Sequence, residues 1–368
     1  MEQLTKDVSE GSGSSLFARR RTSQLDITHL LAASAKPSPA KELVANSEPE
    51  FDVLARFRAE LARETPAAPA AVHVLTDLIR CSRYETMFGL ELEVRRACDK
   101  MISYARSSEL SVKAACELFL KFITRTSFDF PDFDECKAKL IQRGEYFRAL
   151  TDTCRERIAL LGEPFIQQGN TVLTHGGSRV VFNILERAAK VVRKQFQVVV
   201  TEGRSRPESI HSAGITNKTL RFCRDLVRLG VPVTIIPDSA VAAAMEAIDI
   251  VLLGAEAIAE SGATINQTGS LNIAVAAKAL NVQLFVAAES YKFVRIYPLT
   301  QRDITRTDAE SAPRAYRQVV RNEDIPRQIQ YECPSSDLTP GSYISLLITD
   351  LGVLTPVAVS EALMKMYQ

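Results

Sequence analysis

The chain has 368 residues, of which 46% are hydrophobic, and its 45 Lys and Arg nearly balance its 44 Asp and Glu to give a net charge of +1. This length suffices for two domains with separate hydrophobic cores. The near-zero charge argues against a general nucleic-acid-binding protein, because such proteins carry a clear basic excess, and no run approaches the roughly 18 apolar residues that cross a membrane.

The cysteines and the amino terminus bear on the cellular compartment. The seven cysteines are dispersed, with no CxxC pair and no histidine at metal-ligand spacing. An odd, scattered count fits reduced thiols in the cytosol rather than disulfides or zinc. The first 15 residues lack an apolar segment behind a basic one, as a secretory signal would have. We therefore expect a cytosolic protein with no membrane partner, no metal site and no cofactor.

The first part of the chain predicts a tail followed by helices. Residues 1–48 are rich in Ser, Ala, Lys and Arg without a lasting period, which predicts a disordered tail. Residues 49–168 predict an α-helical domain, because apolar residues recur at three- and four-residue spacing. Helices are expected over residues 71–79, 90–106, 111–124, 132–149 and 151–168.

After Asn170 the pattern alternates between short apolar runs and helical segments, so residues 169–368 predict a Rossmann-like α/β domain with a doubly wound parallel sheet. Strands are expected over residues 171–173, 197–201, 231–236, 248–253, 283–288 and 343–349. Helices are expected over residues 180–194, 215–229, 240–247 and 271–279, and after Pro356. Residues 260–270 predict a loop, and residues 300–340 a polar insertion.

Polar clusters follow the predicted strands, and the carboxyl ends of parallel strands form the edge where ligands bind. Glycines there let backbone amides approach an anion, and the following helices offer their positive ends. This is not the dinucleotide fingerprint, because no GxGxxG follows the first strand. The pattern predicts a phosphate or sugar-phosphate pocket. Its candidate residues are His175, Gly176, Gly177, Ser178, Arg179, Glu202, Arg204, Asp238, Glu256, Asn266, Gly269, Ser270 and Lys292.

Each of these residues also has an ordinary structural interpretation. Ser, Asp and Gly at strand ends are common caps and turns, and His175 is either a base or a satisfied structural histidine. Glu256 is either an acid or base with a pKa raised by burial or a cap for the following loop. Arg179 either holds a ligand or pairs with Glu202 or Asp238.

Several segments carry a family resemblance: THGGSRVV, LLGAEAIAESGATINQTGS, FVAAESYKFVR and ITDLGVLTPVAVSEAL. From about residue 53 to the carboxyl terminus the chain resembles the alpha subunits of eukaryotic translation initiation factor 2B. The resemblance implies a homodimer that joins the beta, gamma, delta and epsilon subunits of that guanine nucleotide exchange factor. It also implies a regulatory role, in which the helical domain helps sense initiation factor 2 phosphorylated on its alpha subunit and exchange is inhibited.

The same fold resembles the isomerases of methylthioribose 1-phosphate and ribose 1,5-bisphosphate, which makes an aldose-phosphate isomerase the alternative. Those enzymes use a cysteine after the first strand and an aspartate in the GA(D/E) segment. The corresponding residues here are Gly176 and Glu256, so we expect no isomerase turnover and a pocket that binds without chemistry. We expect the homodimer to form through the carboxy-terminal domain, because the resemblance implies it and residues 344–348 and 353–354 are so apolar.

Overall fold

The structure is a computed structural model that describes residues 51–63, 65–105, 109–129, 132–203, 216–306, 317–319 and 332–367. The predicted tail over residues 1–48 lies outside these ranges. Pro49–Gln368 form one compact unit, in which helices and sheet share contacts. The division at residue 168 into two domains stays a prediction.

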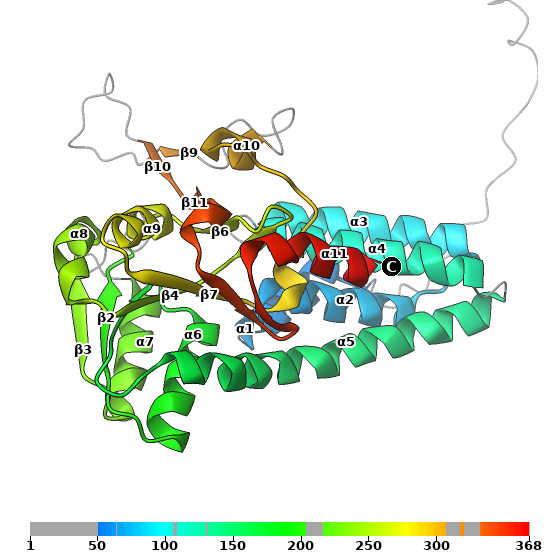
Figure 1. Cartoon of the computed structure of the whole chain (residues 1–368). Coiled ribbons are helices and arrows are strands. Elements are labelled where there is room, and N and C mark those ends of the chain that lie inside the picture. Colours follow the sequence, from blue (N-terminus) through cyan, green and yellow to red (C-terminus); the bar gives the residue numbers. More distant parts are fainter. Residues whose placement is uncertain are drawn as a thin grey trace, which may run out of the picture. The chain divides into compact units, whose positions relative to one another are not determined.

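The first part of this unit is helical, as the apolar spacing predicts (Figure 1). Asp52 caps the first helix by accepting a hydrogen bond from the Ala55 amide at 3.0 Å, and Phe57, Leu75 and Leu90 are fully buried in the core that the helices share. The helices are α1 (Val53–Ala62), α2 (Ala67–Cys81), α3 (Met87–Ala105), α4 (Glu109–Asp129) and α5 (Phe133–Gly162).

The two helices predicted over residues 132–149 and 151–168 are a single helix, so that prediction was wrong. No Gly or Pro interrupts the junction, and the Thr151 hydroxyl donates to the Arg148 carbonyl oxygen at 2.8 Å within the helix. Helix α5 ends before Pro164, which cannot continue it. Figure 1 shows α5 passing α2 and then α6, so one rigid element belongs to both parts.

The second part is a seven-stranded sheet in the order β13-β12-β7-β4-β1-β2-β3, parallel except for the edge strand β13. This confirms the predicted α/β fold. Successive crossovers run outward from β1 in one direction and from β4 in the other, so the order reverses between these two strands. The strands are β1 (Thr171–His175), β2 (Gln197–Thr201), β3 (Val233–Ile236), β4 (Ile250–Gly254), β7 (Gln283–Ala287), β12 (Leu346–Thr349) and β13 (Gly352–Leu354).

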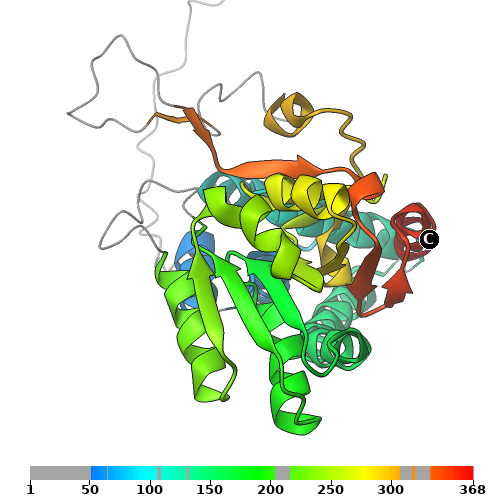
Figure 2. The ribbon, with the colours of Figure 1, turned by 60° about the vertical axis from the view of Figure 1, so that its left-hand side comes forward.

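Helices cover both faces of this sheet (Figure 2). The end of α5 packs on one face with α6 (Arg179–Glu186) and α7 (Asn217–Arg228). The other face is covered by α8 (Val241–Ala244), α9 (Ser270–Ala279) and α11 (Val359–Tyr367). Helices α6 and α8 are shorter than predicted, because a π-turn follows α6 and 3-10 turns flank α8.

The segment predicted as a loop over residues 260–270 contains strand β6 (Thr264–Gln267), so this prediction was also wrong. It pairs with β5 (Ala257–Ala259) and with β11 (Ser336–Thr339), and β8 (Phe293–Val294) completes a four-stranded sheet. Strands this short carry no readable period, and β11 lies about 70 residues farther along the chain. The predicted insertion also contains α10 (Gln301–Arg306), β9 (Arg317–Val319) and β10 (Glu332–Pro334).

The apolar carboxy-terminal segment has an internal explanation. Ile344, Leu347 and Ile348 are at most 6% exposed and belong to the cores of the sheet. The apolar character of these three residues therefore does not indicate a dimer interface. Val353, which the same prediction cites, is 38% exposed, and the homodimer stays a prediction. Among the helices in the described ranges, none combines the length and apolarity that crossing a bilayer requires.

Candidate functional site

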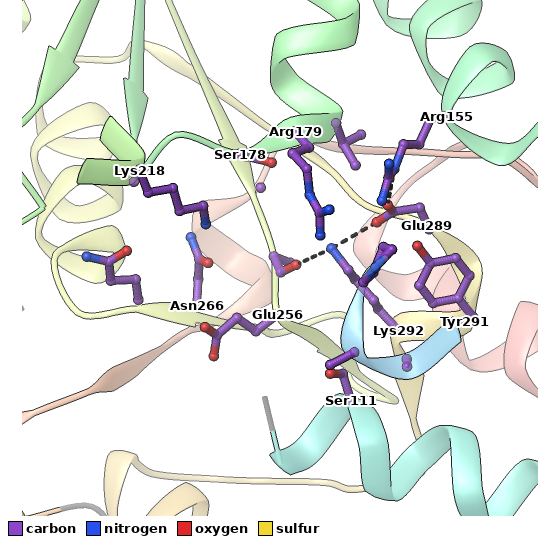
Figure 3. Close-up of a pocket in the computed structure, with 18 of the residues that line it drawn as sticks. Ser111, Arg155, Ser178, Arg179, Lys218, Glu256, Asn266, Glu289, Tyr291 and Lys292 are labelled. Carbon is purple, nitrogen blue, oxygen red and sulfur yellow. Dashed lines mark hydrogen bonds and ion pairs between the residues drawn. The ribbon is translucent and has the colours of Figure 1, made fainter. Parts of the chain in front are cut away.

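A cavity of about 160 Å³ lies where the strand order reverses, beyond the carboxyl ends of β1 and β4. This is the position where open parallel sheets bind ligands. Figure 3 shows Arg179, Lys218 and Lys292 directed into it, with Glu256 and Asn266 on the same wall. Seven predicted site residues line the cavity: His175, Gly176, Ser178, Arg179, Glu256, Asn266 and Lys292.

The turn after β1 depends on two glycines. Gly176 and Gly177 have φ angles of +68° and +61°, in the left-handed region that other residues rarely adopt. A Cβ atom on Gly176 would lie 2.8 Å from Oε1 of Gln267, so a side chain there would meet the cavity wall. The turn leads into α6, whose amino end has no side-chain cap and whose first residue is Arg179. The local sequence thus places a cation and uncapped amides beside the cavity.

His175 is a structural histidine in this arrangement. It is 2% exposed, its Nε2 lies 3.1 Å from the Thr268 carbonyl oxygen, and its Nδ1 lies 2.5 Å from Oγ1 of Thr201. Because a carbonyl only accepts, Nε2 carries the proton and Nδ1 accepts from the hydroxyl. Burial lowers the pKa of His175 and outweighs the opposing charge of Asp238. The ring is neutral, and both nitrogens are occupied.

The amino end of α9 is occupied from within the protein. Asp337, on β11, accepts hydrogen bonds from the amides of Gly269 and Leu271 at 2.8 and 3.0 Å. Ser270 is likewise engaged, because its hydroxyl accepts from the Asn266 side chain and donates to the Gln267 carbonyl. A carboxylate therefore already satisfies the helix end that the sequence suggested for a phosphate.

Burial raises the pKa of Asp337 to about 6, and the negative charge of Glu256 adds to the rise, although the α9 amides oppose it. A raised folded-state pKa means that Asp337 stabilises the fold most below its ordinary pKa of 3.8, and that this contribution is lost as the pH rises through 6. Asp337→Asn keeps an acceptor oxygen without the ionisation. We expect it to gain roughly 2 kcal/mol of unfolding free energy relative to wild type between pH 4.5 and 8.

Denaturant unfolding of wild type and Asp337→Asn at the two pH values measures this gain. Asp337→Ala is the control, since it removes the helix cap and should cost about 1–2 kcal/mol at pH 8. If the difference between wild type and Asp337→Asn is the same at both pH values, the raised pKa is contradicted.

A buried ion network of Arg155, Glu289 and Lys292 forms part of the cavity wall. Glu289 is 1% exposed and accepts from Nε of Arg155 at 3.2 Å, and Nζ of Lys292 lies 2.8 Å from its other oxygen. Lys292 also donates to the Ala255 carbonyl oxygen at 2.8 Å. Burial alone would raise the pKa of Glu289, but Lys292 and then Arg155 outweigh it and hold this pKa at about 2. The network carries charge at any physiological pH.

Other predicted residues stand apart from the cavity lining. Asp238 accepts from the Gly203 amide at 3.0 Å, and the Glu202 carbonyl oxygen accepts from Thr219. Gly177 turns the chain into α6, and Gly269 and Ser270 serve the α9 cap described above. Arg204 lies outside the described residues. Within the ranges that the structure describes, no group of three metal-ligating side chains occurs.

Sequence reasoning missed several lining residues. Lys218 lies at the start of α7, where an inspection of helix starts could have found it. Glu289 and Gln267 lie in the polar clusters that follow the predicted strands, although neither is among the candidates. No local signal indicates the lining residues of the helical part, because that part and the sheet meet only in the folded chain. The lining residues absent from the prediction are Pro66, Ala67, Ala68, Ser111, Arg155, Val180, Lys218, Gly254, Ala255, Gln267, Glu289 and Tyr291.

Comparisons with known proteins agree on one family. Residues 63–356 match the model of the Initiation factor 2 subunit family. The chain is 40% identical over 324 residues to translation initiation factor eIF2B subunit alpha of Dictyostelium discoideum, covering 86% of this chain and 98% of that protein. It is 33% identical over 199 residues to ribose 1,5-bisphosphate isomerase of Archaeoglobus fulgidus, covering 54% and 58% of the two chains.

Solved structures show the same fold. A chain of the tetrameric eIF2B-beta2-delta2 complex from C. thermophilum superimposes with a TM-score of 0.66 at 17% identity, covering 86% of this chain and 94% of that one. The translation initiation factor eIF-2B of Pyrococcus horikoshii superimposes with a TM-score of 0.60 at 22% identity, covering 84% and 98%. At these identities the likeness concerns architecture, which is helical at first and α/β afterwards.

Proposed function

Because the chain belongs to the Initiation factor 2 subunit family, we propose that it is the regulatory alpha-type subunit of the guanine nucleotide exchange factor for translation initiation factor 2. The observation that carries the proposal is the 40% identity to an eIF2B alpha subunit over nearly its whole length. In this proposal a cytosolic homodimer joins the beta, gamma, delta and epsilon subunits. Its helical part helps sense the phosphorylated alpha subunit of initiation factor 2.

The proposal assigns no catalysis to this chain. We place Gly176 where related isomerases carry a cysteine, and no residue that lines the described cavity has a thiol. His175 is buried with both nitrogens hydrogen-bonded, so it is not poised to move a substrate proton. The isomerase alternative is favoured only by the 33% identity to ribose 1,5-bisphosphate isomerase over part of the chain.

We further propose that the cavity binds a phosphorylated sugar without turning it over. Arg179, Lys218 and Lys292 supply charge for a phosphate, and Glu256 and Asn266 supply acceptors and donors for hydroxyl groups. Since Asp337 occupies the α9 amides, the phosphate belongs near the turn after β1 and the start of α6 rather than at α9.

Reconstitution with the four other subunits tests the regulatory role. Complexes with and without this chain are compared for GDP release from initiation factor 2, with and without phosphorylation of its alpha subunit. We expect phosphorylation to inhibit exchange strongly only when this chain is present. Failure to join the complex, or equal inhibition without this chain, would contradict the proposal. Multiple turnovers of ribose 1,5-bisphosphate or methylthioribose 1-phosphate by the purified chain would favour the isomerase.

Arg179→Ala tests the pocket. Losing a hydrogen bond to a charged group costs about 1.5–3 kcal/mol, so we expect affinity for the preferred sugar phosphate to fall roughly 10- to 150-fold. Melting scans and titration calorimetry with pentose and hexose phosphates measure the effect. The control is Arg228→Ala, which removes an exposed arginine of α7 that pairs with Asp225. A wild-type protein whose melting point no sugar phosphate shifts would refute the pocket and leave the regulatory proposal standing.

A further inference from the structure

The turn Ser290–Lys292 connects the cavity to the interior of the helical part. We propose that Tyr291 couples the two, so that events in the cavity change the stability of α4 and α5. The coupling itself is a property of this fold, while its control by a ligand rests on the sugar-phosphate pocket proposed above.

Tyr291 follows β7 but belongs to the core of the helices. It is 5% exposed and is buried in the cluster formed by α1–α5. Its ring packs edge-on against Phe147 of α5, with the ring centroids 6.1 Å apart. The turn also contacts α4 and α2. A residue supplied by the α/β part thus completes the hydrophobic core of the helical part.

The residues beside Tyr291 are fixed to the sheet and to the cavity. Ser290 donates twice to Asp350 at the end of β12, from its amide and from its hydroxyl, each at 2.7 Å. Glu289 and Lys292 are held in the buried ion network. Because both flanks are anchored, a shift of the cavity wall moves the tyrosine rather than being absorbed in the turn.

The hydroxyl of Tyr291 is the polar end of this connection. Tyr291 lines the polar cavity, and its buried hydroxyl has no hydrogen-bond partner within hydrogen-bonding geometry, although Arg155 and Glu289 lie beside it (Figure 3). Burial and the Glu289 charge raise the pKa of Tyr291 well above its ordinary value, so the hydroxyl stays a neutral donor. A ligand oxygen in the cavity would compete with Glu289 for the proton that this hydroxyl donates.

Tyr291 also borders unfilled apolar space. A second cavity, of about 30 Å³, lies between α2, α4 and α5 and is bounded by Phe119, Phe122, Phe147 and Tyr291. This space is partly open to solvent, and side chains beside unfilled space make fewer packing contacts. Unfilled space beside the ring leaves it room to shift, and in this proposal a hydrogen bond at its hydroxyl sets its position.

Amide hydrogen exchange in α4 and α5 tests the coupling in the full chain without any ligand. Lys292→Gln weakens the network but leaves Glu289 paired with Arg155. We expect exchange in peptides from residues 112–126 and 133–147 to accelerate roughly 2- to 10-fold, which corresponds to the net contribution of one hydrogen bond. The matched control is Lys365→Gln, which removes a lysine of α11 from an exposed ion pair with Glu361 and should leave these peptides as in wild type. Equal exchange rates in the two variants would overturn the proposal.

The ligand arm uses ribose 5-phosphate and glucose 6-phosphate as probes, with sulfate as the control anion. A sugar phosphate that binds wild type should slow the same peptides, and Tyr291→Phe, which keeps the ring but loses the hydroxyl, should abolish that slowing. The coupling would be overturned if a sugar phosphate bound wild type without slowing amide exchange in these peptides. It would also be overturned if exchange slowed as much in Tyr291→Phe as in wild type. If neither probe binds wild type, the ligand-pocket proposal loses its support, and the comparison of the two lysine variants alone decides the coupling.

Discussion

Glu289→Gln is expected to lower the free energy of unfolding by about 3–5 kcal/mol, because it removes one partner from a buried ion network. The amide has the shape of the carboxyl group but no charge, so Arg155 and Lys292 would remain mostly buried beside each other without a counter-ion. Two like charges in a region of low permittivity repel each other, and neither can regain its hydration without opening the junction between α5 and β7.

Guanidinium unfolding of wild type and variant, followed by circular dichroism, measures this loss. The control is Glu91→Gln on α3, where the carboxylate pairs with Arg95 at 2.6 Å on an exposed helix surface. Such surface ion pairs contribute little to the free energy of unfolding, so the unfolding free energy of this variant should be close to that of wild type. Similar unfolding free energies for the two variants would contradict the assigned role of Glu289.

The difference in unfolding free energy between wild type and Glu289→Gln should also depend on pH. The pKa of Glu289 is held at about 2, below its ordinary value of 4.5. A depressed folded-state pKa stabilises the fold above the ordinary pKa, and this contribution is lost as the pH falls through 2. The difference between wild type and Glu289→Gln should therefore be full at pH 6 and shrink progressively below pH 4.5.

Gly262→Ala is expected to lower the free energy of unfolding by roughly 2–5 kcal/mol, combining a left-handed backbone with a steric overlap. Gly262 has a φ of +75° in the turn between β5 and β6, and a Cβ atom there would lie 2.2 Å from the carbonyl oxygen of Pro356. The obstructing atoms are backbone, so no side chain can rotate away. The turn positions Asn266 and Gln267 of β6, and we expect the cavity to loosen with it.

Gly230→Ala is the matched control, since Gly230 has a φ of +79° but no atom within 4 Å of the added Cβ. It carries only the conformational cost of about 1–2 kcal/mol. The difference between the two variants in denaturant unfolding isolates the overlap with Pro356. Equal losses would show that the turn can move away from Pro356 at little cost.

Features that depend on neighbouring residues could be predicted from the sequence. Parallel strands are buried on both faces, so continuous apolar runs such as residues 197–201 and 283–288 indicated strands close to their observed bounds. The glycines after β1 require a tight turn, and that turn lies at the cavity. The family resemblance, carried by motifs at these strand ends, agrees with the comparisons.

Features that depend on contacts between distant segments were decided by the tertiary structure. Asp337 caps α9 from a strand 66 residues away, and Arg155 meets Glu289 across 134 residues. Tyr291 fills the helical core, although its neighbours belong to the sheet. No local period encodes such pairings, because burial and charge compensation are set by which surfaces meet in the folded chain. The sequence by itself thus determined the parallel strands and the edge where they place polar groups, whereas packing decided which of those groups line the cavity.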